Sequence, residues 1–534
     1  MKYDVIIVGG GITGLSIAYR FIDSYKKILL IECTNKLGGK IKSIKDNTND
    51  LIYEAGAARI SENHTKTLNL IEELGFNDQL IKLPKDIDYI IDNEKKEVNL
   101  FVLINSVLNN YYKIKNDEKT KNKIKIEDIN FFQLCIDTIG YNKALLLKNM
   151  FGYDAEFMKM NAAATLQLFK KDFSIDSDYF ILKNGLSQLI TKMEKLINRE
   201  KYITIKKKEK LLEVYNNNSI LTDNNIYNYD NLILAIPHKE LLQINIFEEL
   251  DLLDAVESVP LLRIYAKYPT NNGEVWFKNI KRTITDNYIR HIIPIDYEKG
   301  LIMISYIDSE YAEMWNDSII SNNKSVIERL HKEIKTLFKI EPPEPEYIKY
   351  YYWNSGLHVW KPGYSPTKLY EEILKPFEDE LIFVCGDSFS LQQGWIEGGL
   401  ETSYDVLEKL EIKDISFNRN IKKEENNDIN ISNVKNVNDL YNIYDVIKKK
   451  TWIVIELDKK YIYDLTNFID TYQQTEWDID KLINSNKYYI KDGKDKKYPI
   501  KPIDLFKKLY KSKDTLNRYF KEENEYVKKV GILI

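Results

Sequence analysis

The first 32 residues show the clearest pattern of apolar and polar positions in the chain. Residues 5–8 form a short unbroken apolar run, which is typical of a parallel strand that is buried on both faces. Apolar residues then recur at helical spacing over 15–21, and a second apolar run covers 28–31. This order predicts a strand, a helix and a second strand, the repeating unit of α/β folds with parallel sheets.

Glycines at the spacing G-x-G-x-x-G fill the turn between the first strand and the helix. Gly9 permits the tight turn, Gly11 lets the backbone approach a pyrophosphate, and Gly14 lets the helix pack closely on the strand. The helix N-terminus adds free N–H groups and a positive dipole for the phosphates. Glu32, which ends the second strand, can accept hydrogen bonds from both hydroxyls of an adenosine ribose. The stretch predicts a dinucleotide site; an ordinary glycine-rich turn is the alternative.

The chain continues to about residue 410 with alternating helical and strand patterns. A mainly helical region is predicted over 61–173, with an exposed, charged loop at 113–125, and hairpin strands follow over 202–236. Further predicted elements are a strand at 259–268, two strands within 287–307, a helix at 325–338, and a strand followed by a helix within 382–410.

Composition narrows the classes of function. A chain of 534 residues has room for about two to four domains. A net charge of −4 gives no electrostatic basis for binding nucleic acid. The 3 cysteines are widely spaced, so we expect neither a disulfide framework nor a zinc site, and an intracellular, cytoplasmic setting. No apolar run reaches the roughly 18 residues that a membrane span requires.

Two further stretches complete a resemblance to a known family. Gly38 and Gly39 form a double-glycine turn followed by Lys40, and an E-x-G-x-x-R stretch contains Gly56 and Arg59. Together with the glycine fingerprint, these stretches resemble the flavin-dependent amine oxidases, which include monoamine, polyamine and L-amino acid oxidases. The resemblance implies FAD, with the double-glycine turn beside the diphosphate and Gly56 near the isoalloxazine ring. Lys40 stands where the family usually has arginine; either cation can meet a phosphate.

Two arginines are expected at the reacting end of this site. In L-amino acid oxidases the position of Arg59 binds the substrate carboxylate; a flavin-side or salt-bridged arginine is the equal alternative. The strand at 259–268 resembles the one on which the family carries a lysine that holds a water against flavin N5, and Arg263 stands there instead. Alternation puts Arg263, Tyr265 and Lys267 on one face, so a slip of four residues would restore the lysine. A strand-surface role for all three is the remaining alternative.

The segment 382–410 resembles the last flavin-binding segment of the family. The resemblance implies that Asp387 binds the ribityl hydroxyls. It also implies that the helix beginning near Ile396 points its N-terminus at the flavin pyrimidine, where the helix dipole stabilises negative charge. Trp395 is a candidate wall of the aromatic slot over the ring, with a plain core aromatic as the alternative.

The absence of a cysteine near Leu357 and of histidines in residues 445–534 predicts how cofactors are bound. Leu357 lies closest to the position where covalent monoamine oxidases carry a cysteine, so we expect FAD to be bound without a covalent link. His358 beside it is a further candidate for the pocket. Residues 445–534 resemble a cytochrome b5-type module, whose axial ligands are histidines, yet all 5 histidines of the chain precede residue 360. We therefore expect a b5-like domain without haem.

The predicted fold is α/β, with a Rossmann-like FAD-binding domain interleaved with an α+β substrate domain and a small α+β domain at the C-terminus. The predicted ranges are 1–60, 175–250 and 380–412 for the FAD-binding domain, 61–174 and 251–379 for the substrate domain, 413–444 for a linker, and 445–534 for the b5-like domain.

The reaction implied by the resemblance is hydride transfer from an amine or L-amino acid to flavin N5. The imine would hydrolyse, and dioxygen would reoxidise the flavin with release of hydrogen peroxide. One alternative is another flavin reaction, such as desaturation of an apolar substrate. A second is a catalytically weak flavoprotein that acts as a binding or assembly module. An unknown protein is the partner expected for the C-terminal domain.

Overall fold

The structure is a computed structural model that describes residues 2–116, 124–172, 177–248, 250–321 and 323–410, together with six short strands beyond residue 451. The chain divides into two compact units, Met1–Asn420 and Ile421–Ile534. Within the described residues, no helix combines the length and the apolar content that crossing a bilayer requires.

The first unit contains a seven-stranded sheet that is centred on β1 (Lys2–Val8) and carries the nucleotide-type turn. β1 runs parallel to β2 (Ile28–Glu32) on one side and to β13 (Ile226–Leu234) on the other. The other strands are β10 (Ile203–Lys207), β11 (Leu211–Tyr215), β12 (Ser219–Thr222) and β19 (Ile382–Val384). Because the central strands are buried on both faces, their sequences are continuous apolar runs.

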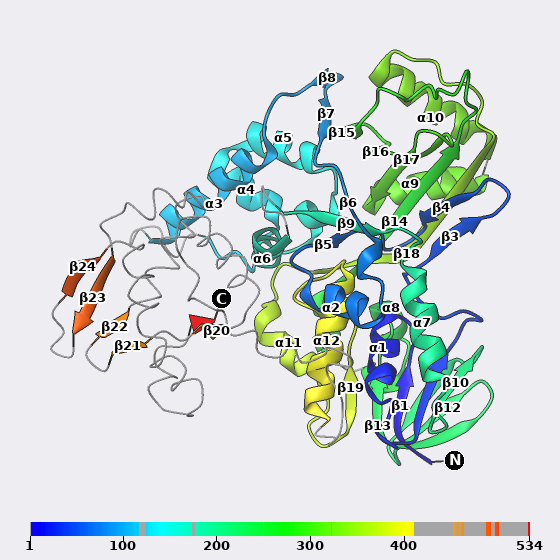
Figure 1. Ribbon diagram of the computed structural model, residues 1–534, viewed down its shortest axis with the longest axis vertical. Coiled ribbons are helices and arrows are strands. Elements are labelled where there is room, and N and C mark those ends of the chain that lie inside the picture. The colour runs from blue at the N-terminus through cyan, green and yellow to red at the C-terminus, as the bar shows by residue number, and fades with distance from the viewer. Residues whose placement is uncertain are drawn as a thin grey trace. The chain divides into compact units, whose positions relative to one another are not determined.

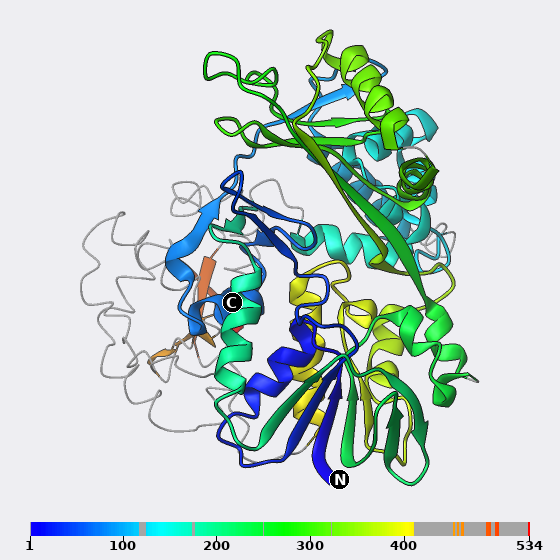
Figure 2. The same cartoon turned by 90° about the vertical axis from the view of Figure 1, so that its right-hand side faces the viewer.

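Helices cover one face of this sheet and form a common core with it. α1 (Ile12–Arg20) packs against α7 (Ser187–Ile197) and α12 (Ile396–Lys409), and Figure 2 shows these helices side by side over the strands. Arg20 of α1 forms a fully buried ion pair of 2.7 Å with Glu73 at the end of α2 (Thr65–Glu73). Arg20 also donates to the Tyr404 hydroxyl, so one guanidinium joins α1, α2 and α12.

A second seven-stranded sheet has the order β18-β14-β17-β16-β15-β7-β8. Its longest strands, β14 (Val256–Lys267) and β18 (Tyr347–Trp360), are antiparallel neighbours. The other strands are β17 (Leu301–Asp308), β16 (His291–Asp296), β15 (Arg282–Thr285), β7 (Ile87–Ile91) and β8 (Glu94–Lys95). The helices α9 (Ser309–Ser321) and α10 (Asn323–Phe338) pack on this sheet, as seen in the upper right of Figure 1.

A group of helices with its own apolar core precedes β9 in the chain. Its members are α3 (Leu100–Asn116), α4 (Phe131–Ile139), α5 (Tyr141–Phe151) and α6 (Ala162–Asp172). A single π-helical turn, Ala155–Lys159, lies between α5 and α6. The loop predicted at 113–125 is wrong in its first residues, because α3 continues through Asn116 and Tyr111 still anchors that helix in the core.

The first unit is completed by short elements. These are β3 (Ser43–Asp46), β4 (Leu51–Glu54), β5 (Ile60–Ser61), β6 (Leu80–Lys82), β9 (Tyr179–Leu182), α8 (His238–Leu241), α11 (Pro366–Leu374) and the 3-10 turns Asn77–Gln79, Asn245–Phe247, Asp251–Ala255 and Asp387–Phe389.

Six strands are described in the second unit. They are β20 (Trp452–Ile453), β21 (Glu456–Asp458), β22 (Tyr461–Tyr463), β23 (Tyr488–Asp492), β24 (Lys497–Ile500) and β25 (Ile532–Leu533). β21 to β24 form an antiparallel sheet in chain order, and β20 pairs with β25. The predicted linker and the positions expected to carry haem ligands in a b5 domain lie outside the described residues.

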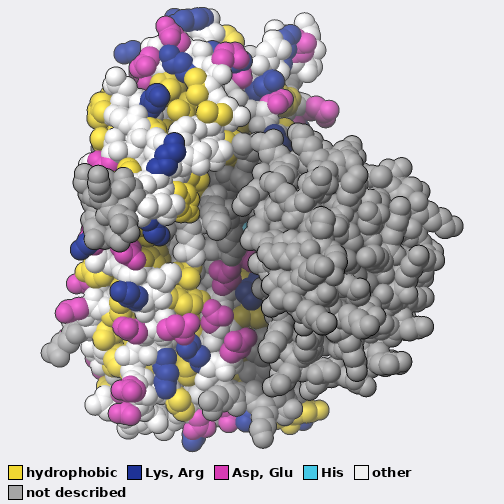
Figure 3. Space-filling view, turned by 90° about the vertical axis from the view of Figure 1, so that its left-hand side faces the viewer, with side chains coloured by type: hydrophobic (Ala, Val, Ile, Leu, Met, Phe, Trp, Pro, Cys, Tyr) yellow, Lys and Arg dark blue, Asp and Glu magenta, His cyan; other side chains and the backbone are white. Residues whose placement is uncertain are grey.

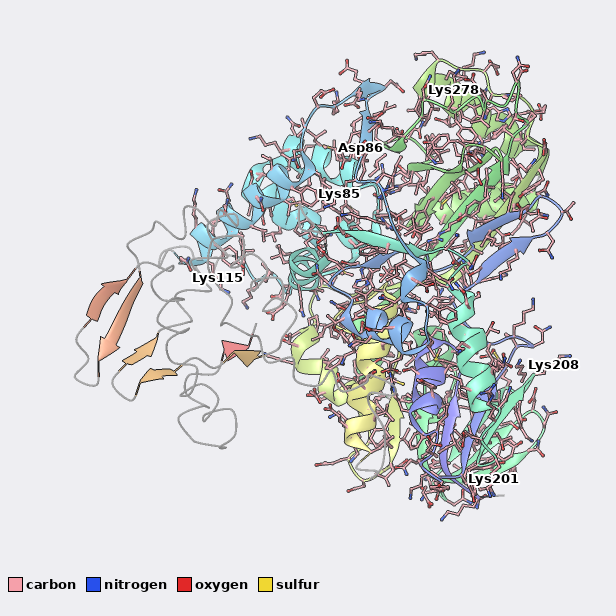
Figure 4. All side chains as sticks on the ribbon, viewed as in Figure 1. Lys85, Asp86, Lys115, Lys201, Lys208 and Lys278 are labelled. Atoms are coloured by element: carbon pink, nitrogen blue, oxygen red, sulfur yellow. The ribbon has the colours of Figure 1, made fainter. Side chains whose placement is uncertain are left out.

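Charged side chains of both signs are interspersed on the face shown in Figure 3. In the side-chain view, the labelled Lys201, Lys208 and Lys278 point outward at the edges of the first unit (Figure 4), and all three are exposed. The face in Figure 3 therefore shows no patch of a single sign that would suit a polyanion such as nucleic acid.

Candidate active site

A cavity of about 1240 Å³ is lined by residues of both large sheets. One part of its wall is the turn after β1 together with the end of β2, where Gly11 and Glu32 lie. Another part is formed by residues of β14 and β17, including Arg263 and Asp308. A dinucleotide-type turn and a polar pocket from a different sheet therefore share one space.

Each fingerprint glycine has its own steric reason in the structure. A Cβ at Gly9 would lie 2.3 Å from the Ala235 carbonyl oxygen, and Gly9 has a positive φ of 107°. A Cβ at Gly14 would lie 2.0 Å from the Gly9 carbonyl oxygen, so this glycine lets α1 pack on the strand. A Cβ at Gly11 would meet no atom within 4 Å, because this residue borders the cavity. Free space over Gly11 and an uncapped helix N-terminus fit a bound pyrophosphate.

Glu32 joins the end of β2 to the glycine turn. Its Oε2 accepts the Gly10 N–H at 2.9 Å and its Oε1 accepts the Thr34 N–H at 2.8 Å. These bonds fix the carboxylate beside the cavity. Oε1 also accepts the Cys33 S–H at 3.5 Å, and Oε2 keeps a further lone pair for a ribose hydroxyl. The residue is thus held where the fingerprint predicts it.

The double-glycine turn lies directly against the fingerprint. The Gly38 N–H donates to the Gly10 carbonyl at 2.8 Å, and both Gly38 and Gly39 have positive φ, 121° and 55°. A Cβ at Gly39 would lie 3.3 Å from the Gly11 Cα. Gly56 lies against the same turn, because its Cβ would be 1.9 Å from the Lys40 carbonyl oxygen.

Lys40 and Asp387 line the cavity as an ion pair, with Nζ and Oδ2 2.7 Å apart. His358 lies behind them, its Nδ1 3.5 Å from the same Asp387 oxygen. Burial would raise the pKa of the Asp387 carboxyl, but Lys40 and His358 hold it well below its usual range. Burial, assisted by the charge of Lys40, lowers the pKa of His358 to about 4. His358 is completely buried and is not part of the cavity wall, so its expected place in the pocket is wrong: the side chain supports Asp387 instead.

Arg59 is surrounded by aromatic rings at the cavity wall. Its guanidinium carbon lies 5.7 Å from the ring centre of Tyr179 and 5.9 Å from that of Trp395. Those two rings are stacked with centres 6.3 Å apart, and the Arg59 Nη2 donates to the Tyr153 hydroxyl at 3.4 Å. No carboxylate of the described residues forms an ion pair with Arg59, so a salt-bridged arginine is not what the geometry shows.

Arg263 lies on β14 and also reaches the cavity. Its Nη1 donates to the Glu54 carbonyl at 2.9 Å, and its guanidinium carbon lies 4.5 Å from the Tyr306 ring centre. Tyr265 donates to the same carbonyl at 2.7 Å, although a bulge interrupts the strand pairing at this point. Lys267 is paired with Glu346 and is not part of the cavity wall. The structure therefore brings the arginine, and not the lysine, into the site.

Two acids of this site carry no sequence motif. Asp308, at the end of β17, accepts the backbone N–H groups of Asp154 at 3.0 Å and Ala155 at 2.9 Å, and so fixes the start of the π-helical turn. Glu156 follows within that turn, and both acids line the cavity. Burial and the Asp308 carboxylate raise the pKa of Glu156 to about 8, while burial and Asp154 raise that of Asp308 to about 6. The only sequence signal was an acid at the end of an apolar strand, and it pointed to Asp308 alone.

The first turn of α12 opens on the cavity through Trp395 and Ile396. Trp395 is the N-cap residue and forms no capping bond, which leaves the helix N-terminus free. Glu397 points away and accepts the backbone N–H groups of Lys66 at 2.9 Å and Thr67 at 2.8 Å, which caps α2. Leu357 lines the cavity as an apolar residue.

A Rossmann-type sheet whose glycine turn opens on a cavity shared with a second, mostly antiparallel sheet defines a dinucleotide-binding fold. Residues 12–406 match the family described as flavin containing amine oxidoreductase, and the chain belongs to that family. The family implies FAD as the cofactor, and the open space over Gly11 agrees with it. The predicted family and the predicted α/β fold are confirmed.

Relatives of this chain differ in what their names say they do. An uncharacterized protein of Acanthamoeba polyphaga mimivirus is 23% identical over 487 residues, which cover 77% of this chain and 94% of that protein. Protoporphyrinogen oxidase of Dictyostelium discoideum is 23% identical over 411 residues, which cover 59% of this chain and 75% of the relative. The 15-cis-phytoene desaturase of Narcissus pseudonarcissus is 35% identical, but this chain spans only 17% of its length.

Solved structures share the fold over about three quarters of the chain. A putative protoporphyrinogen oxidase from Exiguobacterium has a TM-score of 0.58 at 16% identity, covering 76% of this chain and 98% of that one. A putrescine oxidase mutant has a TM-score of 0.60 at 14% identity, covering 77% of this chain and 99% of that one. At such identities the likeness shows the fold, and the chain is an oxidoreductase by family.

Proposed function

We propose that this protein is an FAD-dependent oxidase of amines or L-amino acids. The substrate would lose a hydride from the carbon beside its amino group, and water would hydrolyse the resulting imine to a carbonyl compound and ammonia. Bound FAD would supply the electron acceptor, and dioxygen would regenerate it with release of hydrogen peroxide. The observation that carries this proposal is the single cavity in which the glycine turn meets a polar pocket lined by Arg59, Arg263 and Glu156.

The cofactor would be held by groups that already face the cavity. The N–H groups at the start of α1 and the space over Gly11 suit the pyrophosphate. Glu32 suits the adenosine ribose, and Lys40 with Asp387 offers one donor and one acceptor to the diphosphate and the ribityl chain. Because Leu357 offers no thiol, the cofactor would be bound without a covalent link.

At the substrate end, Arg59 would bind a carboxylate and Trp395 would form an aromatic wall. Arg263 would orient a water through the N–H groups that its bond to Glu54 leaves free. An arginine keeps its proton at any accessible pH, so Arg263 would not act as a base. This differs from the lysine that the family carries, and it leaves proton transfer to another group.

The chemistry of the pocket favours a polar substrate over an apolar one. An apolar hydrocarbon would leave the buried Glu156 Oε2 and Arg263 Nε without hydrogen-bond partners, which is unfavourable. Protoporphyrinogen is a second candidate, because its carboxylates could also meet the two arginines. A binding module without turnover remains the candidate from another class.

The test measures FAD content by absorbance and peroxide release with amines, L-amino acids and protoporphyrinogen. We expect stoichiometric FAD, released by denaturation, and peroxide with at least one amine or amino acid. Turnover of protoporphyrinogen alone would favour the second candidate. Bound FAD with no turnover of any compound would favour a binding module, and a colourless protein would contradict the proposal.

A further inference from the structure

The substrate end of the cavity contains a guanidinium and a carboxyl group that do not pair with each other. Arg59 and Glu156 both line it, and the charge of Arg59 acts on Glu156. Their side chains form no ion pair within 4.0 Å, and no other described carboxylate pairs with Arg59. An acid and a guanidinium that share a cavity without meeting are both left available to a ligand that carries both charges.

Glu156 is carried by a turn with an unusual backbone conformation. Its Oε2 is buried and has no hydrogen-bond partner among the described residues. The turn that carries it, Ala155–Lys159, is π-helical, a conformation that occurs frequently at functional sites. Each oxygen of Asp308 accepts one backbone N–H at the start of this turn, so Asp308 positions the turn that carries Glu156.

We propose that Glu156 binds the amino group of the substrate and accepts its proton while Arg59 binds the carboxylate, so that the substrate is an α-amino acid and not a simple amine. This inference rests on the proposed function. In the step itself, one N–H bond of the substrate ammonium breaks and one O–H bond forms on Glu156. The products are a neutral carboxylic acid and a neutral amine that keeps its lone pair, and no electron is transferred.

The surroundings of Glu156 match this task. The groups that act on its charge are Asp308 of β17, Asp154 of its own segment and Arg59. Burial and Asp308 raise the pKa of Glu156 to about 8, whereas Arg59, like a bound ammonium, favours its carboxylate form. A raised pKa makes the carboxylate of Glu156 a better proton acceptor than that of an exposed glutamate. Arg263 cannot take this proton, because a guanidinium is already fully protonated.

The test uses three ligands that separate the two charges: L-phenylalanine, 3-phenylpropanoate and 2-phenylethylamine. Leucine and glutamate with their matched analogues extend the set. Binding to the FAD-loaded protein is measured without oxygen by calorimetry and by the shift in melting temperature, so that turnover is not the readout. The variants are Glu156→Gln, Glu156→Asp, Arg59→Gln and, as a matched control, Glu240→Gln, which removes a carboxylate elsewhere on the cavity wall.

We expect the wild type to bind at least one amino acid at least tenfold more tightly than either single-charge analogue. Glu156→Gln should weaken amino-acid binding by about tenfold or more and change binding of the carboxylate analogue by less than about twofold. Arg59→Gln should weaken binding of the carboxylate analogue and leave binding of the amine analogue nearly unchanged. Glu240→Gln should change the binding of neither analogue. Glu156→Asp, which keeps a carboxyl group, should retain part of the affinity for the amino acid. This variant still tests the role of Glu156 if the glutamine variant folds poorly.

Different failures have different meanings. A wild-type protein without FAD contradicts the proposed function itself. An FAD-containing wild type that binds amines as tightly as amino acids, or none of the ligands, overturns the substrate class inferred from Glu156. Equal losses for all three ligands in Glu156→Gln show that the residue is structural and also overturn the inference.

Discussion

Replacing Gly11 with alanine separates the folding role of the fingerprint from its role in binding the cofactor. Gly11 has φ −72° and ψ −179°, a conformation open to any L-residue, and an added Cβ would meet no atom within 4 Å. Alanine loses less conformational entropy than glycine on folding but is a slightly poorer N-cap. These effects oppose each other, so the free energy of unfolding of the cofactor-free protein should change by less than about 0.5 kcal/mol.

The effect on FAD should be much larger. A methyl group in the space over Gly11 would push the pyrophosphate away from the N–H groups of α1. Losing two charge-assisted hydrogen bonds at about 1.5 kcal/mol each amounts to about 3 kcal/mol, or roughly a hundredfold rise in Kd. At an FAD concentration of about 100 times the wild-type Kd, binding adds about 2.7 kcal/mol to the stability of the wild type but only about 0.4 kcal/mol to that of the variant.

The assay compares FAD content after purification, the Kd from titration of cofactor-free protein, and thermal unfolding with and without FAD. Gly14→Ala is the contrasting variant, because its Cβ would lie 2.0 Å from the Gly9 carbonyl oxygen and should destabilise the fold even without cofactor. A Gly11→Ala protein that binds FAD within about threefold of the wild-type Kd would refute a pyrophosphate seated over this residue.

Four further predictions concern other parts of the first unit and the tail. Arg59→Lys should raise KM for amino acids at least about tenfold more than KM for simple amines, with FAD content unchanged, because lysine lacks the two-point contact; loss of FAD would make Arg59 a cofactor residue. Arg20→Met should lower the free energy of unfolding by about 3–5 kcal/mol, since it removes the guanidinium that pairs with the buried Glu73 carboxylate. Arg20→Met with Glu73→Gln should recover part of this loss in denaturant melts, and an unchanged midpoint for Arg20→Met would contradict the prediction. The folded pKa of His358, about 4, lies below its unfolded value of about 6.5, so its contribution to stability is complete above pH 6.5 and declines by up to about 3 kcal/mol as the pH falls toward 4. Denaturant melts at several pH values should show this decline in the wild type relative to His358→Gln, and parallel curves for the two proteins would exclude it. The full-length protein supplied with haem should show no Soret band, because residues 415–534 contain no histidine; a b-type spectrum would overturn that prediction.

Local sequence determined the nucleotide-type half of this protein. The apolar runs of β1 and β2, the glycine spacing and the terminal acid Glu32 all lie within one stretch of 32 residues. Most of these features depend on neighbours within this stretch, although Ala235 limits the space at Gly9 and β1 also pairs with β13. A pattern of that kind is readable before folding, since the residues that make contact are close together along the chain.

The substrate end was decided by contacts between distant segments. Asp308 holds the turn before Glu156 although the bonded residues are 154 and 153 positions apart. Nothing near Glu156 in the sequence marks it as a site residue, because its burial and its raised pKa come from strands that pack against it only in the folded chain.

Strand register and burial were also outside the reach of local patterns. Alternation alone left Arg263 and Lys267 as equal occupants of one face, and the pairing of β14 with its neighbours placed only the arginine at the cavity. His358 has a polar side chain that suits a pocket, yet the packing of β18 buries it behind Asp387. The sequence by itself determined which chemical groups were present in order along the chain. Tertiary structure decided which of them face the same space, because side chains from different sheets meet only when the long strands have paired.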